Sequence, residues 1–78
     1  MTTTLRVPKL AVSMQEGTLL EWLVEDGQPV TEGQPLYTLE IEKAAMEVEA
    51  PASGILRQIG TRETAYKVGE IIGEILSP

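Results

Sequence analysis

Short stretches in which apolar and polar residues alternate run along most of the chain, and turns rich in glycine and proline separate them. Alternation with a period of two is the pattern of a half-buried β-strand. Turn signals of this kind occur at positions 25–29, 31–33, 51–54 and 68–69. Many short strands at such close spacing predict an all-β sandwich or barrel. The expected strands are Leu5–Val7, Thr18–Val24, Pro35–Ile41, Ala45–Ala50, Gly54–Ile59 and Ile71–Leu76.

The segment 40–49 fits two local structures. It is rich in helix formers, and four of its apolar residues have the i, i+3, i+4, i+7 spacing of a short helix. The alternative is a β-hairpin with Glu42 and Lys43 as the central residues of a tight turn. The hairpin accounts for both arms at once, so we favour it, and it places Lys43 at the tip. It pairs Leu39 with Met46 and Tyr37 with Val48 on one face, and Thr38 with Glu47 on the other.

The two halves of the chain resemble each other weakly. The run that begins at Gly17 aligns with the run that begins at Gly54, and the run from Gly33 aligns with the run from Gly69. Two similar halves suggest two sheets related by a pseudo-two-fold axis. The Lys43 hairpin then lies in the single stretch that connects them.

Composition excludes several classes of function. The 78 residues make one small domain, 1–78, and they include neither Cys nor His. Disulfides, thiolate metal sites and the usual nucleophile–base pairs are therefore absent. The formal net charge of −6 disfavours nucleic acid and anionic membranes as partners. No apolar run approaches the roughly 20 residues that span a membrane, and the first residues lack the layout of a signal peptide. We expect a monomeric, non-catalytic domain.

An ordered set of segments carries a more specific signal. It consists of 8–17, 22–30, the motif Glu40-Ile41-Glu42-Lys43-Ala44, and 47–54. Together these resemble the lipoyl domain of 2-oxo acid dehydrogenase acyltransferases, within the wider biotinyl/lipoyl-attachment family, over nearly the whole chain. The resemblance implies a flattened β-barrel or sandwich of two four-stranded antiparallel sheets with pseudo-two-fold symmetry (a barrel-sandwich hybrid). It also implies that Lys43 is the lipoyl-attachment residue, flanked by Glu40, Glu42 and Ala44.

The resemblance implies a carrier function as well. Lipoate on Lys43 is expected to act as a swinging arm in a 2-oxo acid or acetoin-type dehydrogenase complex. The implied partners are a lipoate ligase or lipoyltransferase, a thiamin-dependent decarboxylase, an acyltransferase catalytic domain and dihydrolipoamide dehydrogenase. The expected location is the cytoplasm of a bacterium, or the mitochondrial matrix of a eukaryote.

The chemistry of the lysine agrees with a carrier. An ordinary lysine, with a pKa of about 10.4, is almost wholly protonated at pH 7, and Glu40 and Glu42 favour the charged form further. The domain therefore needs a separate ligase and supplies only the position of the amine. The chain departs from the family at Glu42, where Asp is usual; Glu keeps the charge and adds one methylene.

Two alternatives remain. One is a biotin carrier on the same fold, although biotin acceptors typically have Met on both sides of the lysine and Lys43 lies between Glu42 and Ala44. The other is an unmodified, lipoyl-like structural module. Among the remaining residues, we expect Met14 to serve packing and Trp22 to lie in the core. The acids at 40, 42, 47 and 49 form either a solvated face or a surface read by a partner. Gly27, Gly33, Gly54 and Gly69 are expected in turns or bulges.

Overall fold

The computed structural model describes residues 1–42 and 44–77, and this part of the chain forms eight β-strands. It contains no helix long and apolar enough to cross a membrane. The strands are β1 (Thr2–Arg6), β2 (Glu16–Trp22), β3 (Pro29–Val30), β4 (Pro35–Ile41), β5 (Ala44–Glu49), β6 (Gly54–Gln58), β7 (Thr64–Lys67) and β8 (Ile71–Leu76).

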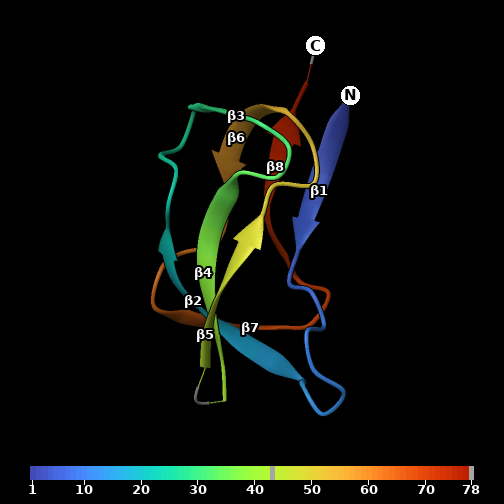
Figure 1. Cartoon of the computed structure of the whole chain (residues 1–78), viewed down its shortest axis with the longest axis vertical. Coiled ribbons are helices and arrows are strands. Elements are labelled where there is room, and N and C mark those ends of the chain that lie inside the picture. Colours follow the sequence, from blue (N-terminus) through green and yellow to red (C-terminus); the bar gives the residue numbers. More distant parts are fainter. Residues whose placement is uncertain (43, 78) are drawn as a thin grey trace.

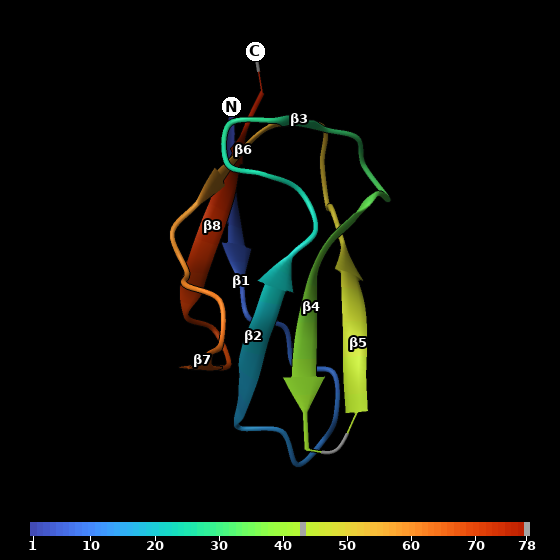
Figure 2. The same cartoon turned by 90° about the vertical axis from the view of Figure 1, so that its left-hand side faces the viewer.

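The strands form two four-stranded antiparallel sheets that face each other (Figures 1 and 2). One sheet has the order β1-β8-β6-β3 and the other has the order β5-β4-β2-β7. The two orders become identical when β1 to β4 are exchanged with β5 to β8. This topology confirms the pseudo-two-fold relation that the sequence repeat suggested, because β2 corresponds to β6 and β4 corresponds to β8. The sheets do not close into a complete barrel, so the fold is the sandwich form of the predicted architecture.

Two of the predicted strands, Pro35–Ile41 and Ile71–Leu76, have the predicted bounds. The apolar pattern misses two others, β3 and β7. Strand β3 has only two residues and begins with a proline, and β7 has only four residues, so neither shows a period-two pattern. The predicted strand Thr18–Val24 is wrong by two residues at each end, because β2 runs from Glu16 to Trp22.

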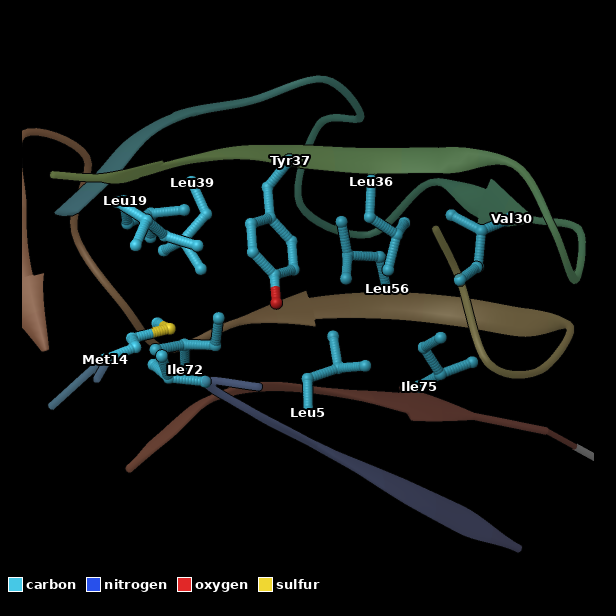
Figure 3. Packing of buried hydrophobic residues seen from close by; sticks show 13 residues of the cluster. Leu5, Met14, Leu19, Val30, Leu36, Tyr37, Leu39, Leu56, Ile72 and Ile75 are labelled. Atoms are coloured by element: carbon cyan, nitrogen blue, oxygen red, sulfur yellow. The ribbon is translucent and has the colours of Figure 1, made fainter. Parts of the chain in front are cut away.

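The core lies between the sheets, and Leu19, Leu36, Tyr37, Leu39, Leu56, Ile72 and Ile75 fill it (Figure 3). Leu36 and Tyr37 are adjacent in sequence, yet both are buried. The register between β4 and β5 shifts between Pro35 and Tyr37, and such an irregularity turns two neighbouring side chains to one face. Trp22 is half-buried at the border of this core rather than inside it.

Met14 is buried, as expected. All four glycines predicted in turns or bulges have positive φ angles: Gly27, Gly33, Gly54 and Gly69. The start of β1 and the end of β8 lie together at one end of the elongated molecule, and the β4–β5 hairpin lies at the other (Figure 1). The fold therefore separates the hairpin from the start of β1 and the end of β8.

Candidate functional site

The β4–β5 hairpin has the register that the sequence predicted. Leu39 pairs with Met46, Tyr37 with Val48 and Thr38 with Glu47. The ladder continues through Glu40 and Ala45 to the last pair, Ile41 with Ala44. Lys43 itself lies outside the described residues. The residues around it show that the segment is a hairpin and not a helix.

Burial along the hairpin shows how far the core holds β4. Leu39 is fully buried and Ile41 is only 7% exposed, so β4 is held in the core almost to its last residue. In contrast, Glu42 and Ala44 are exposed, which leaves free space for a covalent attachment at this end. The hairpin thus combines a buried base with exposed residues on both sides of position 43.

Glu42 has a left-handed backbone conformation, with a φ of 55°. This region is unfavourable for residues with a Cβ, and Asn and Asp enter it much more readily than Glu. The side chain of Glu42 extends toward the loop that joins β1 to β2, where the hydroxyl of Ser13 donates a hydrogen bond of 3.4 Å to its Oε1. Local strain at position 42 is therefore part of the geometry of the tip.

The loop beside the tip is anchored by Met14. This side chain is 4% exposed, and its Sδ accepts a hydrogen bond from the backbone N–H of Leu10 at 3.3 Å. The N–H of Met14 donates to the carbonyl of Ala11 at 3.1 Å. Between this loop and the hairpin lies an open hollow of about 610 Å³, lined by Ser13, Met14, Gln15, Glu16, Ile41, Glu42 and Lys67. Sequence reasoning missed Ser13 and Lys67, because only the fold brings them to this end.

The four acids of the motif region are all exposed, but they do not form one cluster. Glu40 and Glu42 lie near the end of the hairpin. Glu47 and Glu49 lie farther along β5, and Glu49 is five residues from Ala44, about 16 Å at the rise of a β-strand. No group of three or more potential metal ligands occurs in residues 1–42 and 44–77. The acids therefore form an extended negative surface along one edge of the sandwich.

We predict that Glu42→Asn stabilises the domain by about 0.5 to 1 kcal/mol, because Asn tolerates the left-handed conformation better. Urea unfolding followed by Trp22 fluorescence measures the effect as a higher midpoint at an unchanged slope. Glu40→Asn is the matched control: this neighbouring exposed acid lies in a regular strand, where Asn brings no gain. A midpoint lowered by Glu42→Asn would show that losing the contact of Glu42 with Ser13 outweighs any relief of backbone strain.

Comparison with known proteins agrees with the site. Residues 3–75 match the family model described as biotin-requiring enzyme, which covers biotin and lipoyl attachment. The chain is 41% identical over 72 residues to the dihydrolipoyllysine-residue succinyltransferase component of the 2-oxoglutarate dehydrogenase complex of Bacillus subtilis, covering 91% of this chain and 17% of that protein. It is 46% identical over 52 residues to the dihydrolipoyllysine-residue acetyltransferase component of the acetoin cleaving system of Cupriavidus necator, covering 67% of this chain and 14% of that protein. The chain thus spans less than a fifth of either relative.

Solved structures show the same fold. The lipoyl domain of the 2-oxoglutarate dehydrogenase complex from Azotobacter vinelandii superposes with a TM-score of 0.78 at 24% identity, over 95% of each chain. A segment of a single-chain, multi-domain long-chain acyl-CoA carboxylase superposes with a TM-score of 0.77 at 19% identity, over 99% of this chain and 7% of that one. The chain therefore belongs to the biotinyl/lipoyl-attachment family, as a carrier domain with the fold of a lipoyl domain.

Proposed function

We propose that Lys43 carries lipoate through an amide bond, and that the domain presents this group as a swinging arm. The observation that supports the proposal most strongly is the hairpin register. Ile41 pairs with Ala44, so Glu42 and Lys43 are the two residues of the sequence between the arms. The core holds β4 up to Ile41, and Glu42 and Ala44, the sequence neighbours of Lys43, are exposed to an approaching enzyme. Lipoate, when attached, supplies the acyl-accepting and redox chemistry.

The relatives support lipoate over biotin as the attached group. Both relatives named above are dihydrolipoyllysine-residue acyltransferase components. The flanking Glu42 and Ala44 also differ from the two methionines typical of a biotin acceptor. Treatment with lipoate and lipoate ligase, followed by peptide mapping, tests the assignment. We expect the lipoyl group on Lys43 and not on Lys9 or Lys67. Label on either of those two lysines would contradict it.

We further propose the partners of the arm. A lipoate ligase or lipoyltransferase attaches the cofactor, a thiamin-dependent decarboxylase acylates it, and an acyltransferase catalytic domain receives the acyl group. Dihydrolipoamide dehydrogenase then reoxidises the arm. The names of the two relatives, which belong to a 2-oxoglutarate dehydrogenase complex and an acetoin cleaving system, support this set of partners.

The two exposed acids of β5 lead to a prediction about the decarboxylase. Glu47 and Glu49 are exposed on β5, and modification of Lys43 removes the one positive charge of the hairpin. A decarboxylase with a basic rim is steered toward such a surface, chiefly through its association rate. We expect the double reversal Glu47→Lys and Glu49→Lys to slow reductive acylation roughly threefold to tenfold at low ionic strength. The difference should shrink as salt screens the charges.

The control is the double reversal Glu25→Lys and Glu63→Lys, which changes the net charge equally. Both residues are exposed; Glu25 follows β2 and Glu63 precedes β7, and β4 separates these two strands from β5 in the sheet. The rate of acylation of each lipoylated variant by the decarboxylase, measured across a salt series, separates local from global effects of charge. If the Glu47/Glu49 variant and the parent are acylated at equal rates at low salt, these acids form only a solvated face and do not contribute to recognition.

A further inference from the structure

The sandwich is open between β1 and β5, which are edge strands of different sheets. A hollow of about 320 Å³ occupies this opening, and its walls are largely apolar. Leu5, Pro8, Val48 and Pro51 form most of these walls, and Tyr37 also lines the hollow. Val48 lies four residues along β5 from Ala44, about 13 Å at the rise of a strand. The hollow is therefore separate from the tip of the hairpin.

Tyr37 places a polar atom in this apolar setting. Its side chain is only 2% exposed and crosses from β4 toward the facing sheet (Figure 3). The hydroxyl of Tyr66 accepts a hydrogen bond from the N–H of Thr61 at 2.7 Å, whereas residues 1–42 and 44–77 provide no such partner for the hydroxyl of Tyr37. Among these residues, every side-chain polar atom that is fully enclosed has a hydrogen-bond partner. Because the Tyr37 hydroxyl has none, it is not fully enclosed and must border open space. The hollow that Tyr37 lines supplies that space.

The chemistry of the hollow defines the ligand that fits it. Burial raises the pKa of Tyr37 to about 12, so its hydroxyl is protonated and can donate a hydrogen bond at neutral pH. A buried tyrosine hydroxyl normally has a hydrogen-bond partner. Arg6 and Glu49 carry opposite charges at the border of the hollow, and the Arg6 guanidinium donates to the carbonyl of Gly69 at 2.9 Å. Opposite charges of equal size favour an uncharged ligand.

We propose that this hollow is a binding site for a small, uncharged molecule with an apolar ring body and one hydrogen-bond acceptor, which the Tyr37 hydroxyl contacts. The volume is about twice that of a protein cavity that takes up benzene, so a molecule of two fused rings fits. The walls supply apolar contact and the hydroxyl orients the ligand, which is the usual division of roles in a small-molecule site.

The test is a titration of the unmodified chain with 1-indanone, a neutral bicyclic ketone, followed by NMR chemical shifts. We expect saturable shifts centred on Leu5, Tyr37 and Val48, with a millimolar dissociation constant. Tyr37→Phe keeps the ring and removes the donor, and it should weaken binding about twofold to tenfold. Val48→Phe fills the hollow and should abolish the saturable shifts.

Tyr66→Phe is the matched control, because it removes the other tyrosine hydroxyl, whose partner is Thr61. Binding by this variant should equal binding by the parent, and urea unfolding of all three variants confirms that they are folded. Absence of saturable shifts in the parent would mean that water alone satisfies the Tyr37 hydroxyl and would overturn the proposal. Equal affinity of the parent and Tyr37→Phe would overturn it as well.

Discussion

Lys43→Ala is expected to remove all uptake of lipoate and all reductive acylation. The chain has three lysines, Lys9, Lys43 and Lys67, and only Lys43 lies in sequence between the paired hairpin residues Ile41 and Ala44. A ligase selects its lysine by the position in which the fold presents it, so the other two should not substitute for it. Mass spectrometry after treatment with lipoate ligase measures the uptake, and the rate of acylation by the decarboxylase measures the function.

The matched variants are Lys9→Ala and Lys67→Ala, which should accept lipoate like the parent. We also expect Lys43→Ala to change the free energy of unfolding by no more than about 0.5 kcal/mol, as is usual for surface substitutions away from special features. Uptake of lipoate that survives in Lys43→Ala would refute the assignment of this residue. A loss of several kcal/mol would instead assign Lys43 a structural role.

Gly54→Ala should cause the largest loss of stability from a single added methyl group. Gly54 begins β6 and pairs with Val30, close to the end of β8. A Cβ at this position would lie 2.5 Å from the carbonyl oxygen of Leu76 and 2.8 Å from the Cγ2 of Ile75. The backbone of β8 cannot shift without disturbing its hydrogen bonds, because β8 is paired on both sides, with β1 and with β6.

We expect this collision to lower the free energy of unfolding by about 3 kcal/mol. A domain of this size has a total of only about 4 to 12 kcal/mol, and the melting temperature should fall by roughly 15 °C. Gly27→Ala is the control: its φ is 85°, but a Cβ there has no heavy atom within 4 Å. It carries only the conformational cost of about 1 to 2 kcal/mol. Equal losses for the two variants, measured by thermal unfolding, would mean that β8 yields to the added methyl group.

The hairpin was predictable because two independent patterns agree there. Alternation in 45–50 and in 35–41 fixes which residues share a face, and a shift by one residue would turn Leu39 out of the core. Helix propensity in 40–49 is a weaker preference, and tertiary pairing overrides it. The register of Leu39 with Met46 could therefore be read from the sequence before the fold was known.

Edge positions were harder to predict than central ones. Met46 is 45% exposed although its partner Leu39 is fully buried, because β5 is the edge strand of its sheet. The short strands β3 and β7 are also edges, and strands of two and four residues are too short for a pattern to emerge. Single-sequence patterns report burial on one face, and edge strands lack much of that signal.

The surroundings of the tip and the Tyr37 hollow could not be read from the sequence either. Ser13 and Glu42 are 29 residues apart and meet only because the loop after β1 folds back onto the hairpin. Similarly, the hollow exists because β1 and β5 belong to different sheets and leave an opening between them. In the strand pattern, Tyr37 counts as one more apolar position. The pattern does not show what surrounds its hydroxyl group.

The central claim is that this chain is a lipoyl carrier modified at Lys43, and one competition measurement tests it most directly. The purified chain is incubated with lipoate, biotin and both ligases together, and its intact mass is then determined. The account predicts the mass of the chain plus one lipoyl group, and fragmentation should locate the group on Lys43. A mass that corresponds to biotin, or the mass of the unmodified chain, would contradict it.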